Sequence, residues 1–377
     1  MRCAQSVILA LLGLVAPGAG GILAEEVAQP AEKPWYEKLQ VNGLAEVSYT
    51  HNFNAPASGK NGYRVFDFNA DTFEIDEIEV VLQTPFSEPG QSGFRVDTTV
   101  GSTVPRVAAA YGLFRDTETG EAEDIDVHQA FAGHVFRAGR GLRLEVGKFC
   151  TPFGYEVIDG YDGYNDNASR SFLFGYAIPF THTGVRASYP LTPTLTGMLL
   201  LTNGWDDAVD NNKAKSVGAQ VTFAPAPPWN LSFSWMGGAE EKDDNHHKRF
   251  LYELVGSWRP RDDMTVGVDA LYGTEQTSVP TNGNLEWSGV AAYFRMGLTK
   301  GFSVSIRGEV FKDGDGARTG TPQTLEELTL TPEYRVSRRL LVRGDLRCDW
   351  SDERVFEEGT SMARRQPTVS LAVLSVF

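Results

Sequence analysis

The sequence predicts an all-β protein, a transmembrane antiparallel β-barrel of about sixteen strands with short periplasmic turns and long extracellular loops. Three observations lead to this prediction. From Leu39 to the C-terminus, segments of roughly ten residues alternate apolar and polar side chains, as a bilayer-crossing strand requires. The connections between these segments alternate between short and long. Most tryptophans lie at or near segment ends, where an amphipathic ring prefers the headgroup boundary.

Composition excludes three other classes of protein. Apolar residues make up only 41% of the 377 residues, which excludes a helical membrane protein, because each spanning helix needs about 18 or more apolar residues. Aromatic residues make up 11% and 39 glycines are spread along the chain, a mixture typical of many short strands rather than of disorder. The formal net charge of −15 argues against nucleic acid as a partner, because phosphate binding needs a basic surface.

The N-terminal residues 1–24 are predicted to be a secretory signal peptide. Their apolar stretch from Val7 to Ala16 is too short to span a bilayer, and helix-breaking residues follow it. We expect cleavage after Ala24 and a destination outside the cytoplasm. Residues 25–38 are then a periplasmic N-terminal segment, and residues 39–377 form the outer-membrane β-barrel.

Strand alternation defines the elements of this barrel. Leu142, Leu144 and Val146, for example, alternate with Arg143 and Glu145. Sixteen strands are expected to begin near Val41, Phe73, Phe94, Ile125, Leu142, Thr183, Leu195, Ser216, Leu231, Phe250, Met264, Leu285, Phe302, Leu325, Leu340 and Thr368. An even number of strands places both ends of the barrel on one rim, which faces the periplasm.

The connections support a barrel over a soluble β-sandwich. Short turns lie at 85–92, 138–141, 190–193, 225–228, 260–263, 300–301 and 336–338. Long polar loops lie at 52–70, 105–123, 150–182, 204–214, 239–248, 275–284, 313–324 and 351–365. Outer-membrane barrels have short turns on one rim and long loops on the other, whereas a sandwich gives no reason for strict alternation.

Two local features are expected within the barrel. Phe73 and Ile75 have the opposite parity to Ile78, which predicts a β-bulge in the second strand. Cys150 and Cys348 lie on the fifth and fifteenth strands of the circuit. Their Cα atoms should therefore be much farther apart than the roughly 7 Å limit for a disulfide, and both should be free thiols.

Aromatic residues give two further indications of a membrane barrel. Trp35, Trp205, Trp229, Trp258, Trp287 and Trp350 all lie at or near strand ends, as aromatic girdles do, and only Trp235 lies well inside a strand. The chain ends on an outward-facing strand with Phe377. This ending resembles the C-terminal strand that bacterial outer-membrane barrels present to their assembly machinery, which is therefore an expected partner.

Four segments resemble the OmpL-like family of β-barrel porins of the Gram-negative outer membrane. They are GKFCTPFGYEVIDGYDGYNDNASRSFLFGYAIPFTHTGVRASYP at 147–190, NGWDD at 203–207, FKDGDGARTG at 311–320 and LEELTLTPEY at 325–334. The resemblance covers essentially the whole mature chain and implies an outer-membrane pore, with no substrate attached. The sequence departs from the family pattern at Cys150 and in the run from Asp162 to Ala168.

The longest loop, residues 150–181, is the candidate constriction of this pore. It follows the fifth strand, where porin-like barrels fold a loop into the lumen. Four charged residues of the loop are expected to set the local field: Asp159, Asp162, Asp166 and Arg170. The alternative is an external cap, or a plug packed on the inner wall by its aromatic side chains, Phe172, Phe174, Tyr176 and Phe180.

Charged residues with inward parity are expected to line the lumen. They are Arg95, Asp97, Arg143, Glu145, Arg186, Arg295, Arg307, Glu309, Arg343, Asp345, Arg347 and Asp349. Sixteen strands enclose an aqueous channel, so we expect these charges to be in water. The alternative is a set of cross-strand ion pairs that closes a packed interior. Because both signs are present, no ion preference can be predicted.

No catalytic residue, metal site or cofactor is predicted. The acidic loops at 206–212, 240–244 and 313–316 are typical of a solvated outer rim, although hard oxygen ligands could hold a divalent cation. His246 and His247 are adjacent, so a strand cannot direct both toward one metal. No serine shares the strand of His128 and His134, and no G-x-S-x-G motif occurs, so the protein is not expected to be an enzyme.

The sequence thus predicts an outer-membrane porin that allows passive diffusion of small hydrophilic solutes or ions through a water-filled barrel narrowed by the 150–181 loop. The expected partners are outer-membrane lipid, the diffusing solutes and the assembly machinery, and a homo-oligomer stays open. The alternative function is a closed barrel that serves as a surface adhesin or structural anchor through its acidic loops. Sixteen strands favour the pore, because barrel diameter grows with strand number.

Overall fold

The computed structural model describes residues 34–108, 113–115, 121–278 and 283–377. Residues from Leu39 to Phe377 form one compact unit. The predicted signal peptide, residues 1–24, lies outside the described residues. Within the described ranges, no helix has the length and apolar character needed to cross a membrane.

β-Strands make up most of this unit. They are β1 (Gln40–Asn52), β2 (Phe73–Thr84), β3 (Ser92–Val100), β4 (Ile125–Phe136), β5 (Leu142–Cys150), β6 (Thr181–Pro190), β7 (Leu195–Thr202), β8 (Ser216–Phe223), β9 (Trp229–Ala239), β10 (Lys248–Arg261), β11 (Met264–Glu275), β12 (Leu285–Gly297), β13 (Phe302–Asp313), β14 (Gln323–Arg335), β15 (Leu340–Arg343), β16 (Leu346–Ser351), β17 (Phe356–Glu358), β18 (Ser361–Ala363) and β19 (Arg365–Val376). The helices are η1 (Trp35–Lys38), α2 (Val104–Val107) and η2 (Leu173–Ala177).

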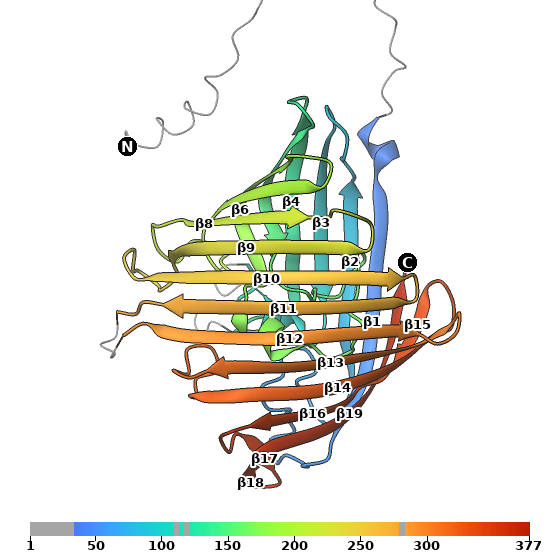
Figure 1. Cartoon of the computed structure of the whole chain (residues 1–377), viewed down its shortest axis with the longest axis vertical. Helices are drawn as coiled ribbons and strands as arrows, with labels where there is room; N and C mark the ends of the chain where they lie inside the picture. The colour runs from blue at the N-terminus through green and yellow to red at the C-terminus, as the bar shows by residue number, and fades with distance from the viewer. Residues whose placement is uncertain (1–33, 109–112, 116–120, 279–282) are drawn as a thin grey trace, which may run out of the picture. The chain divides into compact units, whose positions relative to one another are not determined.

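The strands close into an antiparallel barrel (Figure 1). From β1 to β15 each strand pairs with the next, and β19 pairs with β1 from Leu44↔Val376 to Asn52↔Thr368. β17 and β18 form a separate two-stranded sheet outside the barrel wall. β15 and β16 are two parts of one strand, because both pair with β14 and with β19. In the described part of the chain the barrel therefore has sixteen strands, and each begins within three residues of its predicted start. Closure leaves no open sheet edge.

The pairing of β1 with β19, here called the seam of the barrel, depends on one glycine. Gly43 and Phe377 exchange two backbone hydrogen bonds of 3.0 Å. A Cβ atom at Gly43 would lie 2.4 Å from the carbonyl oxygen of Glu79 and 2.4 Å from the ring of Phe377. Only glycine therefore lets the terminal ring lie over β1 while the seam keeps its register.

The predicted bulge in the second strand is confirmed. Glu46 of β1 pairs with Glu77, and the next residue of β1 pairs with Ile75, so Asp76 is the extra residue. Asp76 and Glu77 are both buried on the inner face. A bulge can direct two successive side chains to the same side of a sheet, which regular alternation forbids.

The two faces of the barrel differ as the alternation predicts. On β13, for example, Ile306 is 40% exposed on the outer face, whereas Arg307 is fully buried on the inner face. Large apolar side chains are exposed on the outer face of almost every strand. Such a surface is far larger than a soluble protein exposes, and lipid chains cover it in a membrane.

Two tryptophans correct the prediction of an aromatic girdle. Trp229 and Trp258 do lie outside, with stacked rings 5.3 Å apart beside a short turn. Trp205 and Trp287 lie inside instead, almost fully buried, with Arg318 above both rings at 4.9 and 5.3 Å. Proximity to a strand end gives the height of a side chain along the barrel, but it does not decide which face the side chain takes.

The cysteine prediction is confirmed. Cys150 at the end of β5 and Cys348 in β16 are both free. The barrel therefore has no covalent crosslink between its described strands, and its closure depends on hydrogen bonds and packing alone.

Substituting Gly43→Val should reduce the fraction of chain that folds. The new side chain would overlap the backbone of β2 and the ring of Phe377, and overpacking of this kind costs roughly 1–3 kcal/mol. We expect the folded, heat-modifiable band on a gel to fall about fivefold or more. The matched control is Gly308→Val on the outer face of β13, where the nearest atom to a new Cβ is 3.7 Å away. Equal folding of the two variants would contradict this account of the seam.

Candidate pore constriction

The connection between β5 and β6 lies inside the barrel. The backbone N–H of Gly154 donates to Glu253 of β10 at 2.9 Å, and that of Tyr161 donates to Glu79 of β2 at 2.6 Å. Farther along, the backbone N–H of Leu173 donates to Glu309 of β13 at 3.1 Å. These acceptors are inward side chains on widely separated strands, so the connection crosses the lumen.

Apolar side chains fix one side of the connection to the wall. Phe172, Leu173 and Phe174 belong to one buried cluster with inward residues of β10 to β14: Leu251, Leu271, Trp287, Ala291, Phe311 and Leu325. Figure 1 shows η2 in green behind β11 and β12, and the indole of Trp287 donates to its Ala177 carbonyl at 3.2 Å. Full burial of one such side chain is worth about 1.5–3 kcal/mol, so this cluster holds the segment firmly.

Inward glycines make room for this packing. A Cβ atom at Gly267 of β11 would lie 2.3 Å from the ring of Tyr155, which stacks on Tyr293 at 4.1 Å. A Cβ atom at Gly289 of β12 would lie 2.9 Å from Leu173. The wall is thus shaped to receive the connection.

Three fully buried arginines tie the wall to the connection. Arg307 pairs with Glu156 of the connection at 2.7 Å and with Glu327 of β14 at 2.8 Å, and it donates to a backbone carbonyl at Ser169. Arg343 pairs with Glu46 of β1 at 2.7 Å and with Asp159 at 2.5 Å.

Arg347 also contacts both the connection and the wall. Its guanidinium donates to the carbonyl of Arg170 and pairs with Asp349 at 2.7 Å. Each of the three arginines therefore has partners on both the wall and the connection. Without the connection, these buried guanidinium groups would lose part of their charge compensation.

The four predicted constriction residues divide into two pairs. Asp159 and Arg170 form an ion pair of 2.9 Å and are almost fully buried, although Asp159 also lines the open cavity described below. They are buried because Asp159 also compensates Arg343 of the wall. Asp162, with a side chain 61% exposed, pairs with Arg95, and Asp166 pairs with Arg295 at 2.9 Å. Burial, the largest influence, raises the pKa of Asp166, whereas Arg295 opposes this shift.

The predicted lumen-lining charges lie on the inner wall, but most of them are covered. The buried ones are Asp97, Glu145, Arg307, Glu309, Arg343, Asp345, Arg347 and Asp349. Those with larger exposure are Arg95, Arg143, Arg186 and Arg295. The expectation of a fully wet lumen is therefore wrong for the side formed by β13 to β16. There the alternative holds, because the connection packs on the wall and buries its ion pairs.

An open cavity remains on the opposite side of the lumen. Its volume is about 510 Å³, and its lining includes inward residues of β2 to β6 together with the connection from Thr151 to Gly163. Arg95, Arg143 and Arg186 reach this cavity from β3, β5 and β6. Arg143 and Arg186 share the carboxylate of Glu145 at 2.7 and 2.6 Å.

A second loop enters the lumen that the sequence analysis did not place there. Arg64, between β1 and β2, is buried and pairs with Asp349 at 2.6 Å. Phe66 packs against Phe174 and Phe180 with ring centroids 5.8 and 6.0 Å apart. The length of this loop was the only signal available, since no sequence pattern marks the residues that turn inward.

The sequence analysis also missed Glu253 and Asp269, which accept the backbone N–H groups of Gly154 and Tyr155. Their inward parity on β10 and β11 was a signal that could have identified them. Alternation gives the face of each strand residue, so these two acids belong with the predicted inward charges.

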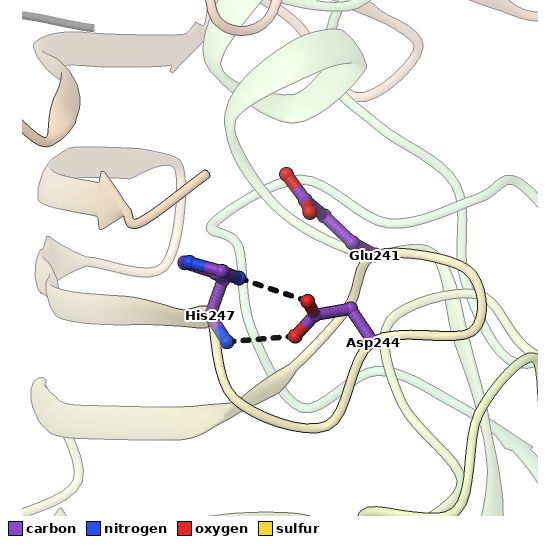
Figure 2. A group of neighbouring side chains, drawn as sticks. All are labelled: Glu241, Asp244 and His247. Carbon is purple, nitrogen blue, oxygen red and sulfur yellow. Dashed lines mark hydrogen bonds and ion pairs between the residues drawn. The ribbon is translucent and has the colours of Figure 1, made fainter. Parts of the chain in front are cut away.

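The acidic loops on the rim satisfy many of their own polar groups. Figure 2 shows Glu241, Asp244 and His247 in the connection between β9 and β10. Asp244 accepts the backbone N–H groups of His246 and His247 at 2.6 and 2.9 Å, and it accepts Nδ1 of His247 at 2.9 Å. These hydrogen bonds hold the pKa of Asp244 well below its usual range. The hydrogen bonds of Asp244 thus stabilise the turn from Asp244 to His247.

The sequence profile of the family described as "Putative beta-barrel porin-2, OmpL-like" matches residues 38–377. None of the curated protein sequences compared with this chain matches it. Among solved structures, the outer membrane channel DcaP of Acinetobacter baumannii superposes with a TM-score of 0.61 at 12% identity, over 90% of this chain and 97% of that chain. The anion-selective porin from Comamonas acidovorans gives 0.59 at 10% identity, over 90% and 99%. Pseudomonas putida OprB gives 0.58 at 11% identity, over 91% and 95%. At these identities the structures are similar in fold.

Substituting Arg343→Met should destabilise the folded protein strongly. It would leave Glu46 and Asp159 buried without their shared cation, and breaking a buried pair from one side costs roughly 3–5 kcal/mol. We expect a clear fall in the temperature at which the heat-modifiable band disappears. Arg261→Met is the control, because its pair with Asp263 at 3.0 Å is exposed and contributes little. A fall of the same size in the control would refute the assigned role of Arg343.

Proposed function

The chain belongs to the OmpL-like β-barrel porin-2 family, and on this premise we propose that solutes pass between the β5–β6 connection and the wall formed by β2 to β6. The protein is a channel of the bacterial outer membrane through which small hydrophilic solutes diffuse passively. Family and fold indicate a channel rather than an enzyme.

The asymmetric packing of the lumen carries this proposal. The connection packs on β10 to β14 with its apolar side chains and on β13 to β16 through buried ion pairs, which leaves no room there for solute. The cavity of about 510 Å³ lies on the other side, where the wall is polar and partly exposed. The connection therefore narrows the lumen and sets the shape of one side of the passage.

Charge at the narrowed section is the basis for selectivity. Arg95, Arg143 and Arg186 approach the cavity from β3, β5 and β6. The acids of its lining are Glu79, Glu145, Glu156, Asp159 and Asp162. Arg143 is the most exposed of the three arginines, with 36% of its side chain accessible. In a narrow, partly dry passage each charge acts more strongly than on the rim. We propose that these arginines attract the anionic groups of passing solutes.

Contacts outside the lumen are proposed as well. The apolar outer face would contact outer-membrane lipid, and the β19 ending at Phe377 would be recognised by the assembly machinery. We also propose a homo-oligomer, because β7 and β8 have only eight residues each. Eight residues at about 3.3 Å, tilted by about 40°, rise roughly 20 Å, less than the roughly 25 Å apolar band of such barrels. A neighbouring copy would cover this thinner part of the wall.

Mass measurements test the proposed oligomer and the proposed leader together. The protein extracted from outer membranes in mild detergent should have a native mass that is a whole multiple of the chain mass. The denatured chain should have the mass expected for cleavage after Ala24. A native mass equal to one chain would reject the oligomer, and a chain that retains residues 1–24 would reject the leader.

Planar bilayer recordings test the channel and its charge. The mature protein should give stable conductance steps, and the double variant R143Q/R186Q should shift the reversal potential in a salt gradient toward cation preference. R261Q is the matched control, because Arg261 is the exposed last residue of β10 and does not line the cavity. Repeated reconstitution without conductance would favour the alternative of a closed barrel that acts as an adhesin or anchor. An unchanged reversal potential in the double variant would reject the proposed path.

A further inference from the structure

A second, much smaller cavity lies between the inner wall and the connection, apart from the proposed solute path. Its volume is about 30 Å³, and four residues of its lining carry carboxylates: Glu46 of β1, Asp67 between β1 and β2, and Asp76 and Glu77 of β2. Serine and threonine residues complete much of the remaining lining, and Arg170 of the connection is its one cationic residue. About 10–15 Å³ is enough for one water molecule, so this space has room for a small ion with a water molecule.

The β-bulge creates this concentration of acids. Asp76 is the inserted residue, so it and Glu77 both face inward beside Glu46 on the neighbouring strand. The three residues are only 6–7% exposed. Regular alternation would have placed one of the two successive acids on the lipid face, where a charge is costly.

Two of these carboxylates lack the partners that burial demands. Oδ1 of Asp76 accepts the hydroxyl of Ser48 at 2.8 Å, but Oδ2 is buried without any hydrogen-bond partner. The carboxylate of Glu77 has neither a hydrogen bond nor an ion pair within the described ranges. Glu46 differs, since it pairs with Arg343 at 2.7 Å.

Arg170, which lines the cavity, and Arg64 already have acidic partners. Arg170 donates to Asp159 at 2.9 Å and to the carbonyls of Val157 and Ala168 at 3.2 and 2.6 Å. Arg64 is held by Asp349 and Asp67. The cavity therefore has an excess of negative charge, and uncompensated buried charge is strongly unfavourable.

We propose that this cavity binds a calcium ion, with Asp76 and Glu77 as its charged ligands. Calcium prefers oxygen ligands and tolerates an irregular arrangement of carboxylates, carbonyls and water molecules around it. Extracellular protein modules bind calcium with dissociation constants of roughly 0.1–1 mM. The cation supplies the positive charge that the arginines do not. Asp76 Oδ2 gains the partner that the protein does not give it.

The bound ion links the wall to the connection. Its charged ligands come from the bulge of β2, and Ser169 and Arg170 of the connection line the same cavity. This inference does not depend on solute passage, so a barrel without conductance would still bind the ion.

Calcium titration of the refolded, lipopolysaccharide-free protein tests the proposal. After EDTA treatment, calorimetry in detergent should detect one calcium site in the wild type and none in D76N/E77Q, whose amides keep the side-chain shape without the charge. Calcium should raise the unfolding temperature of the wild type by about 5 °C and leave that of the double variant unchanged. Without calcium, the double variant should unfold at a higher temperature than the wild type, because the charge excess is gone.

Two further variants make the result specific. E77Q alone keeps the Ser48–Asp76 hydrogen bond and should weaken calcium binding by about tenfold. D244N in the rim group of Figure 2 should bind calcium as the wild type does. The proposal is overturned if the wild type shows no calcium response, or if D76N/E77Q and E77Q both retain the full response. It is also overturned if D244N, rather than the cavity variants, abolishes the response.

Discussion

Arginines buried between the wall and the β5–β6 connection are the interaction on which the rest of the lumen depends. Arg307, Arg343 and Arg347 engage acids or backbone carbonyls of both parts. A buried guanidinium with half its partners removed would be strongly destabilising, so the connection has one stable place in the barrel. The apolar cluster around Phe172 and Leu173 then fixes its orientation. The position of the open cavity follows from these two constraints.

Strand number and strand limits could be predicted because the bilayer imposes them. A spanning strand must direct apolar side chains to lipid and may direct charge only inward, which gives a period of two over the whole barrel. The bulge could be predicted for the same reason, since Ile75 and Ile78 cannot share an outer face without an extra residue between them. The lipid bilayer selects the outward-facing residue of each strand directly, independently of the contacts made elsewhere in the fold.

The state of each inward charge could not be predicted from the same pattern. Arg143 and Arg307 have the same local sequence context, an inward arginine with an inward glutamate two residues later. Arg143 borders the open cavity, whereas Arg307 is fully buried, because the connection packs on β13 and leaves β5 free. That choice is made by contacts between residues more than a hundred positions apart. The inward leucines on β10 and β11, Leu251 and Leu271, were the local sign of an apolar docking surface.

The seam between β1 and β19 has a consequence for the order of folding. Leu44 pairs with Val376 across more than three hundred residues, the largest separation of any described strand pair in the barrel. Contacts of such separation form late, since the loop they close must first be ordered. Until then β1 presents an unpaired edge, and such edges template aggregation. The folding chain therefore has an interval of vulnerability to aggregation that ends only when β19 pairs with β1.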